Sequence, residues 1–353
     1  MPWGKRMIAR LILILLSVTL AFPAGMGRAE AGIPITIGIA PVVPAASTYI
    51  ALDKGWFAEA GFDVTIEEIA TATSLIPFLA TGKIQVVHGG LGAIYFNAMA
   101  QGLPITLALD SGSSPINQDF VIRPDLQDTL KKVDDLKGRS VGFVAPAGVP
   151  VYSVGKLLET VGLTIKDIES KFMTFPDMAT ALSNKAIDAA LAVPPWGDII
   201  VDRKLGVRWL DPSTMIAPKP LELVAYSVNT DWATANPDLA KKLFLVLARG
   251  GREYCQAYHH GSNRAEISET LVKHKIINDR TMVERMPWQA RDPNGHVNQV
   301  SLIDQQEWFY RYGMLKKRAP ENKLADARYA ENAAKELGPF VVENKDSKLE
   351  GCR

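Results

Sequence analysis

The chain has 353 residues, of which 47% are hydrophobic and 22% are charged. This composition is typical of a globular protein, and the length predicts two domains rather than one. Lys and Arg total 39 and Asp and Glu total 38, so a net charge of +1 gives no general electrostatic reason to bind nucleic acid. Two cysteines, Cys255 and Cys352, are too few for a disulfide scaffold or a cysteine-type zinc site. Whether these two pair is left open.

Residues 1–31 have the pattern of a secretory signal peptide. Basic residues at positions 5, 6 and 10 precede an apolar run over 11–22, and residues 29–31 read Ala-Glu-Ala, as a cleavage site requires. A membrane-spanning helix needs ~20 residues, which is longer than this run. No Cys lies near Ala31, which disfavours a lipid anchor. We expect cleavage after Ala31 and export of the remaining chain.

Strands and helices are then expected to alternate. Residues 37–41 form an apolar run that ends in Ala-Pro, which predicts a buried strand with a sharp stop. A helical pattern over 47–60 ends at Gly61, where a left-handed cap is expected. A strand over 62–66, a short helix over 74–81 and a strand over 84–87 complete this unit.

A second unit beginning near residue 139 repeats this order. Residues 141–146 form another apolar run ending in Ala-Pro, and a helical pattern over 151–161 ends at Gly162. A strand over 172–175, a helix over 177–182 and a strand over 187–193 follow. We interpret the pattern as two β-α-β-α-β units with parallel sheets. The alternative is the ordinary pseudo-repetition of any doubly wound protein.

The rest of the chain favours two lobes over a single sheet. Transitions between the units are expected over 110–119 and 216–226. Residues 221–228 form an apolar segment in which Glu222 is embedded, and Asn236 followed by Pro237 predicts the start of a long helix. That helix carries an apolar stripe, which predicts a face buried in the core.

Several ordered segments resemble a known family. Residues 51–57 (Ala-Leu-Asp-Lys-Gly-Trp-Phe) and 60–64 (Ala-Gly-Phe-Asp-Val) are similar to a signature of periplasmic substrate-binding proteins of bacterial ABC transporters. The subgroup includes nitrate, taurine, alkanesulfonate and thiamine-pyrimidine binders. Residues 135–142, 158–167 and 181–195 fit it as well, so the resemblance covers about residues 33–260.

The resemblance implies an α/β type II periplasmic-binding-protein fold, in which two doubly wound lobes are joined by two crossover segments. It divides the chain into a signal peptide (1–31), the first part of lobe one (32–115), lobe two (116–221) and the rest of lobe one with C-terminal helices (222–353). It implies a periplasmic, monomeric, non-enzymatic protein without a cofactor. Such a protein captures a small organic solute between its lobes and delivers it to an ABC permease in the inner membrane.

Ligands bind beyond the carboxyl ends of parallel strands, which directs attention to the loops there. These loops contain no Lys or Arg, so a bound anion would depend on hydroxyls and on backbone N–H groups at helix starts. Flat aromatic side chains favour a planar or partly apolar solute. The candidate ligand-binding residues are Thr48, Tyr49, Thr73, Ser74, His88, Gly90, Ser113, Ser114, Asn117, Gly148, Val149, Tyr152, Pro195, Trp196 and Glu222.

Several candidates also have structural interpretations. Thr73 and Ser74 are suited to cap a helix, Trp196 to core packing, and a lone His88 to a structural role. Glu222, in an apolar segment, is either paired with a backbone donor or directed at the ligand. We expect Trp196 and Tyr152 to flank the ligand together from lobe two.

Two other functions compete with solute transport. The first is an enzyme on the same fold, similar to thiamine-pyrimidine or menaquinone-pathway enzymes. The export signal and the lack of a reactive Cys or His cluster in the candidate loops disfavour it, and no metal-binding pattern occurs. The second is a periplasmic protein that presents its ligand to a sensor. Genes for a permease or for a histidine kinase beside this one would separate these alternatives.

Overall fold

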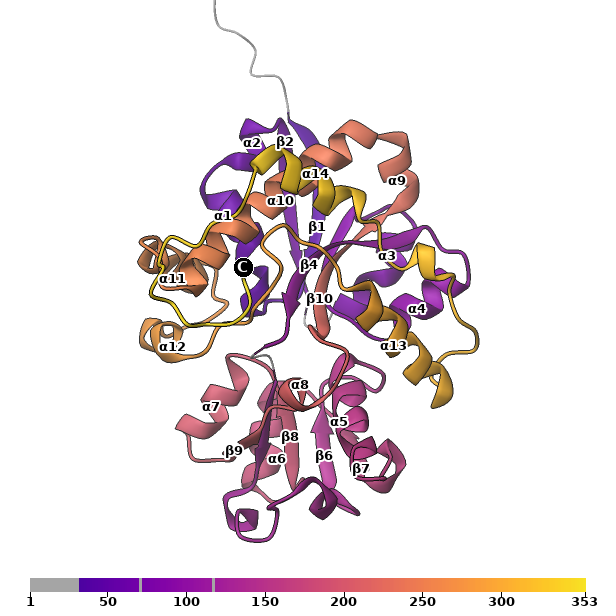
Figure 1. Cartoon of the computed structure of the whole chain (residues 1–353), viewed down its shortest axis with the longest axis vertical. Coiled ribbons are helices and arrows are strands. Elements are labelled where there is room, and N and C mark those ends of the chain that lie inside the picture. The colour runs from indigo at the N-terminus through magenta and orange to yellow at the C-terminus, as the bar shows by residue number, and fades with distance from the viewer. Residues whose placement is uncertain (1–31, 70–71, 116–117) are drawn as a thin grey trace, which may run out of the picture. The chain divides into compact units, whose positions relative to one another are not determined.

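The computed structural model describes residues 32–69, 72–115 and 118–353, without the side chains of residues 72 and 73. The predicted signal peptide, the side chain of Thr73 and all of Asn117 therefore lie outside the described residues. The described chain contains two five-stranded mixed sheets, each accompanied by helices (Figure 1). Among the described residues, no helix is both long enough and apolar enough to cross a membrane.

The first sheet contains β1 (Ile33–Ile39), β2 (Phe62–Glu68), β3 (Val86–Gly90), β4 (Ile105–Ser113) and β10 (Glu222–Asn229). Its strand order is β2-β1-β3-β10-β4. β1 pairs in parallel with β2 and β3, whereas β10 runs antiparallel to β3 and β4. The chain thus completes the first sheet only after it has built the second one.

The second sheet contains β5 (Asp119–Ile122), β6 (Ser140–Phe143), β7 (Glu169–Phe172), β8 (Ala189–Ala192) and β9 (Val207–Leu210). Its strand order, β7-β6-β8-β5-β9, corresponds position by position to that of the first sheet. β6 is parallel to β7 and β8, and β5 is antiparallel to β8 and β9. The two predicted β-α-β-α-β units are therefore confirmed, and this is the topology of the two-lobed type II fold.

Element boundaries differ from the prediction where local caps intervene. The helix predicted over 47–60 is two helices, because Gly55 adopts a left-handed conformation with φ of 72° between them. The strand predicted over 172–175 ends at Phe172, because Thr174 already caps the next helix by accepting a hydrogen bond from the Asp177 amide. The helix ends predicted at Gly61 and Gly162 are confirmed by φ values of 83° and 77°.

Helices cover both sheets and continue to the C-terminal part of the chain. The long helix predicted from Pro237 is confirmed and packs against α1 and β4. The α-helices are α1 (Ala46–Asp53), α2 (Trp56–Glu59), α3 (Ile76–Ala80), α4 (Ala93–Ala100), α5 (Val149–Glu159), α6 (Phe175–Ser183), α7 (Trp196–Asp202), α8 (Pro212–Met215), α9 (Thr230–Ala235), α10 (Pro237–Tyr258), α11 (Arg264–Lys273), α12 (Arg280–Arg285), α13 (Gln299–Arg311) and α14 (Arg328–Leu337). The 3-10 helices are η1 (Val43–Ala45), η2 (Ala72–Leu75), η3 (Pro124–Leu126), η4 (Val133–Leu136), η5 (Ile165–Asp167) and η6 (Glu321–Lys323).

The chain passes between the sheets twice, from β4 to β5 and from β9 through α8 to β10. Both passages overlap the predicted transition segments, and they are bonded to each other. The Ser114 amide donates to the Leu221 carbonyl at 3.0 Å, and the Leu221 amide donates to Ser114 Oγ at 2.7 Å. We call the first sheet with its helices lobe one, and the second sheet with α5, α6, α7 and α8 lobe two.

Helix α13 contacts both lobes. It packs against α4 of lobe one, where the rings of Phe96 and Phe309 lie 6.0 Å apart, and against α5 of lobe two. On the α5 side, Trp308 Nε1 donates to Glu159 at 3.0 Å, and the Tyr152 hydroxyl donates to Asp304 at 2.5 Å. A buried apolar cluster continues from one lobe to the other through this helix.

Cys255 in α10 and Cys352 at the C-terminal end form a disulfide, with their Cα atoms 5.2 Å apart. The question that the sequence left open is thereby answered. The Tyr258 hydroxyl donates to the Glu350 carbonyl at 2.6 Å beside this bond. The final segment of the chain is thus fixed to the longest helix.

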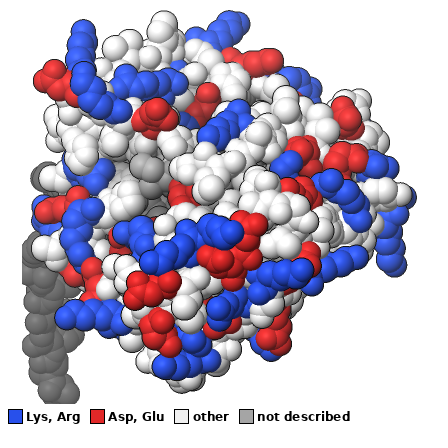
Figure 2. Space-filling view, turned by 60° about the horizontal axis from the view of Figure 1, so that its bottom comes forward, with Lys and Arg blue, Asp and Glu red and all other residues white. Residues whose placement is uncertain are grey.

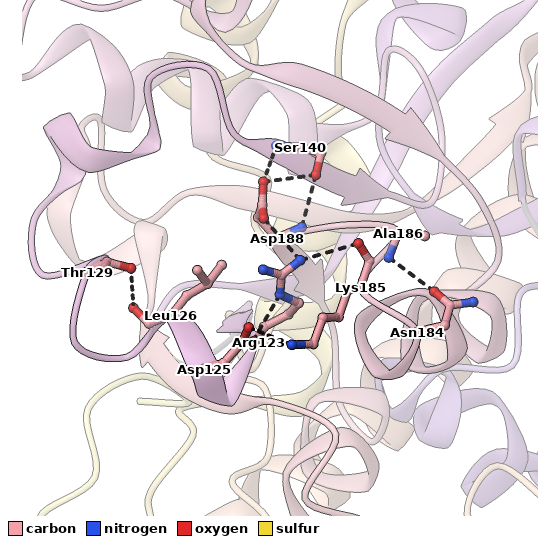
Figure 3. A network of polar contacts seen from close by, with 9 residues as sticks. All are labelled: Arg123, Asp125, Leu126, Thr129, Ser140, Asn184, Lys185, Ala186 and Asp188. Atoms are coloured by element: carbon pink, nitrogen blue, oxygen red, sulfur yellow. Dashed lines mark hydrogen bonds and ion pairs between the residues drawn. The ribbon is translucent and has the colours of Figure 1, made fainter.

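A polar network joins the amino ends of β6 and β8, which form the opposite end of the second sheet from the strands' carboxyl ends (Figure 3). Ser140 and Asp188 exchange hydrogen bonds, since Ser140 N donates to Asp188 Oδ2 at 2.9 Å and Asp188 N donates to Ser140 Oγ at 3.0 Å. Arg123, just after β5, forms ion pairs with Asp188 and Asp125. These charges hold the sheet together rather than forming a site.

Candidate functional site

The carboxyl ends of four parallel strands meet at one pocket between the lobes. β1 and β3 of lobe one and β6 and β8 of lobe two each end at it, as expected for open α/β sheets. The pocket contains about 840 Å³ of space, its open mouth and adjoining solvent included. It is lined by Ala40, Val42, Gly90, Leu91, Gln118, Val144, Ala145, Gly148, Val149, Pro150, Phe175, Val193, Pro194, Leu223, Val224 and Gln289.

Backbone contacts join the lobes beside this pocket, where α4 and α5 begin. The Ala93 amide donates to the Ala147 carbonyl at 2.8 Å, and the Val149 amide donates to the Leu91 carbonyl at 3.1 Å. A Cβ at Gly92 would lie 2.6 Å from the Ala147 carbonyl oxygen, so only glycine permits this approach. The structure therefore has the lobes in direct contact.

The pocket wall is largely apolar. Its only amide side chains among the described residues are those of Gln118 and Gln289, which are 3% and 4% exposed. The Gln118 amide oxygen is buried without a hydrogen-bond partner in the described part of the chain. An unpartnered buried acceptor is costly, so a ligand N–H or O–H group that bonds to this oxygen would remove that cost.

A second groove adjoins the pocket and shares Val42, Val144 and Phe175 with it. The predicted residues Pro195 and Trp196 line this groove, and the Trp196 ring stacks on Phe175 with centroids 6.1 Å apart. Arg285 of α12 and Asp202 of α7 form an ion pair between the lobes, with Nη1 and Oδ1 2.9 Å apart. Trp196 thus borders the extension of the pocket rather than the pocket itself.

Three predicted residues, Ser113, Ser114 and Glu222, line a polar groove at the crossovers instead. Buried Glu222 and Asp110 interact electrostatically there. Burial raises the pKa of Asp110 to about 6, and burial together with the Asp110 charge raises the pKa of Glu222 well above its usual value. Glu222 Oε2 also accepts from the Asn298 amide at 2.8 Å, as its structural interpretation requires.

Three further predicted residues lie outside the pocket wall, and each has a polar atom bonded to a neighbouring side chain. Thr48 Oγ1 lies 2.7 Å from the Tyr226 hydroxyl, and His88 Nε2 lies 2.9 Å from Ser111 Oγ. Tyr49 hydrogen-bonds to Glu68 and stacks on His274 with ring centroids 4.3 Å apart. His88 lies inside β3 rather than after it, and burial lowers its pKa to about 3.

The expectation that Tyr152 and Trp196 flank one ligand requires correction. Tyr152 is fully buried, and its hydroxyl is bonded to Asp304 of α13, because the α5 face that carries it packs on that helix. Tyr152 lines neither the pocket nor the adjoining groove. Ser74 is exposed in η2, and it does not line the pocket. Gly90, Gly148 and Val149 are the predicted residues that the structure places in the pocket wall.

Sequence reasoning missed most of the wall because it searched for polar side chains. Ala40 and Val144 follow the two repeated strands, so their positions were predictable even though their side chains carried no polar signal. Gln289 belongs to an irregular segment far along the chain, and only the fold brings it to the pocket. The described residues contain no group of three or more His, Cys, Asp or Glu side chains arranged to hold a metal ion.

The chain matches one family model and is similar in sequence to a known binding protein. A family model described as "NMT1/THI5 like" matches residues 44–258. Over 267 residues the chain is 22% identical to the nitrate/nitrite binding protein NrtA from Nostoc sp., a match that covers 69% of this chain and 57% of that protein. The chain therefore spans little more than half the length of this curated relative.

Solved structures share the fold across different functions. The periplasmic nitrate-binding protein NrtA from Synechocystis PCC 6803 has a TM-score of 0.72 at 18% identity, with 91% of this chain and 92% of that chain covered. The desulfurization enzyme DSZB has a TM-score of 0.61 at 14% identity, with 87% and 100% covered. Because both binding proteins and an enzyme have this fold, the pocket must decide between these functions.

Proposed function

The chain belongs to the NMT1/THI5-like family, and from this membership and the pocket geometry we propose that it is a solute-binding protein of an ABC transporter. It captures a small organic solute between its lobes and delivers it to a permease. One observation carries the proposal: the pocket wall comes from both lobes, with Ala40 and Leu91 on one side and Val144 and Val149 on the other. A ligand that contacts both lobes stabilises their closed arrangement.

The chemistry of the wall supports binding over catalysis. Among the described lining residues there is no Cys, Ser, Thr, His, Asp or Glu, so the wall offers neither a nucleophile nor a general acid or base. Cys255 and Cys352 are joined in a disulfide away from the pocket. A solute bound here meets surfaces that hold it without reacting with it.

We place the protein in the periplasm. This part of the proposal is supported by the signal-peptide pattern of residues 1–31, by the name of the related periplasmic NrtA, and by a disulfide, which persists in oxidising compartments. Sequencing of the exported protein is expected to give an N-terminus within a few residues of Gly32. Periplasmic material that still begins at Met1 would contradict it.

Native mass spectrometry of the purified protein tests solute capture. A small molecule is expected to co-purify and to be recovered chemically unchanged, whereas a modified product would point to an enzyme. Small-angle scattering of the stripped and reloaded protein should show a monomer whose radius of gyration falls on loading. An unchanged radius under verified saturation would count against closure.

Matched substitutions tie the capture to the pocket. Ala145→Phe fills the wall and is expected to abolish co-purification while the protein remains folded. Ala58→Phe, on the exposed side of α2, adds the same ring elsewhere and should leave capture intact. Equal capture by both variants would place the solute somewhere else.

A further inference from the structure

Among the described residues, no charged side chain lines the interlobe pocket. None of its described lining residues is Lys, Arg, His, Asp or Glu. Between residues 32 and 353, the residues whose side chains are not described are Ala, Thr, Ala and Thr at 70–73 and Ile and Asn at 116–117, none of which is charged. An anion placed here would lose its hydration without gaining a counter-charge.

The nearest buried cation in the crossover region, Arg291, is already engaged. It donates to Ser47 Oγ at 2.7 Å and to the Pro44 carbonyl at 2.9 Å, and its guanidinium lies 4.0 Å from the centre of the Tyr254 ring. It borders the polar groove at the crossovers and does not line the interlobe pocket. Its charge therefore belongs to the framework of lobe one.

Helix N-termini, the other common anion partners, offer few donors at this pocket. In the first turn of α5 the Val149 amide is bonded to Leu91, Pro150 has no N–H, and the Val151 amide is bonded to the Gly148 carbonyl. The Ala93 amide at the start of α4 is likewise bonded across the lobes. At the starts of α4 and α5, these amides are thus bonded to carbonyls of the protein, and two of them join the lobes.

The polar side chains of the pocket wall are the neutral amides of Gln118 and Gln289. The Gln118 side chain is 3% exposed, and its amide oxygen has no partner in the described part of the chain. A ligand N–H or O–H group would satisfy this oxygen, whereas a sulfonate or nitrate oxygen could accept only from the amide N–H groups and would leave the Gln118 oxygen unsatisfied.

We propose that the pocket takes an uncharged, largely apolar solute whose N–H or O–H group donates to Gln118, rather than an inorganic or sulfonate anion. This inference rests on the proposed function, since it names the solute class for that site. On this inference, the chain shares its fold with relatives that bind anions but differs from them in the chemistry of its pocket wall.

Pairs of probes that share a carbon skeleton test the solute class. Benzamide and hexanamide are compared with benzenesulfonate and hexanesulfonate, together with nitrate, by calorimetry on protein stripped of its co-purifying solute. We expect each amide to bind at least about tenfold more tightly than its sulfonate partner. Tighter binding of any sulfonate or of nitrate would overturn the inference and leave solute binding itself standing.

Substitution at Gln118 tests the acceptor. Gln118→Met is expected to weaken amide binding about tenfold, while Gln127→Met, at an exposed position of the same lobe, should not change it. Ala145→Lys places a cation in the pocket wall, so this variant should bind each sulfonate more tightly than its amide partner. This second variant keeps the inference testable if Gln118→Met fails to fold. Unchanged amide binding by folded Gln118→Met would overturn the role of Gln118.

Failure of every probe to bind would overturn the proposed solute class. The mass spectrum of the purified protein then tests the proposed function separately. If an anionic molecule co-purifies, the protein is still a solute-binding protein. If no molecule co-purifies, both the proposed function and the proposed solute class are wrong.

Discussion

Polar side chains near the cleft differ in whether their polar atoms are already used. His88, Thr48 and Tyr152 are buried and bonded to neighbouring side chains, so they serve the framework. Trp196 is only partly buried, stacks on Phe175 and faces the groove that continues the pocket. The residue type alone does not separate these roles, because all four are common in binding sites.

Trp196 and Tyr152 are expected to respond differently to substitution. Trp196→Ala removes a flat wall of the groove and should weaken capture of the co-purifying solute by about tenfold or more, with a small change in the melting temperature. Tyr152→Phe loses the bond to Asp304 and should lower the free energy of unfolding by ~1 kcal/mol with unchanged affinity. Calorimetry gives the solute affinity of both variants, and thermal unfolding gives their stability. A large loss of stability with unchanged affinity in Trp196→Ala would show that Trp196 serves only core packing.

The Glu222 and Asp110 pair predicts a pH-dependent stability. Both pKa values are raised in the folded state, so the pair's contribution is present below the unfolded values near 4 and is lost as pH rises through about 6 and above. Glu222→Gln replaces the carboxyl group with an amide, which can still donate a hydrogen bond but does not titrate. Relative to the unsubstituted protein, this variant should therefore gain stability as the pH rises from 5 to 8.

The measurement is urea unfolding at pH 5, 6.5 and 8, taken as the difference between variant and parent at each pH. The difference is needed because His88, with its pKa lowered to about 3 by burial, makes stability fall as pH drops below 6.5, the opposite slope. The neighbouring charges of Arg291 and Asp292 are unchanged in both proteins. Parallel pH curves would contradict a raised pKa of Glu222 at the crossovers.

Among the elements, helix α13 joins the two lobes through buried side chains. It lies against α5, and the Gly155 position brings the two helices together, since a Cβ there would overlap the Trp308 indole. Lys156 adds an ion pair with Asp304 at 3.0 Å. Opening of the cleft must therefore either carry α13 with lobe two or break this packing.

Two helical glycines make a matched test of that packing. Gly155→Ala is expected to lower the free energy of unfolding by roughly 1–3 kcal/mol, because the new methyl group collides with Trp308. Gly251→Ala in α10 meets only Arg291 atoms 4.0 Å away, so it should be neutral or stabilising by up to ~1 kcal/mol. Denaturant unfolding of both gives the comparison, and equal effects would mean that α5 and α13 are not in close contact in solution.

In the whole molecule, the charges of both signs are interspersed on the face shown in Figure 2. This agrees with the net charge of +1, and the face shown offers no single-signed surface to a polyanion. Stability across long sequence distances comes instead from the core and from one covalent link. The disulfide joins residues 97 positions apart, so it restricts a large part of the unfolded chain.

Loss of that link is expected to lower stability without affecting the pocket. The double variant Cys255→Ser and Cys352→Ser should lose ~2–4 kcal/mol of unfolding free energy, because the unfolded chain regains loop freedom. Solute affinity should not change, since neither residue lines the interlobe pocket. Unfolding with and without a thiol reductant is the measurement: the parent should respond and the double variant should not. If the reductant lowered the stability of the double variant as well, its effect on the parent could not be assigned to this disulfide.

The sequence by itself determined the two repeated units, the positions of their glycine caps and the strand ends at which a site belongs. These follow from hydrophobic periodicity and turn chemistry, which act over a few residues. Only the tertiary structure decided that Gln118 and Gln289 face the pocket while Tyr152 packs on α13, and that Ser113, Ser114 and Glu222 meet at the crossovers. Side-chain direction and partners depend on segments that lie far apart in the chain, such as α5 and α13, and no local pattern records which of them will come into contact.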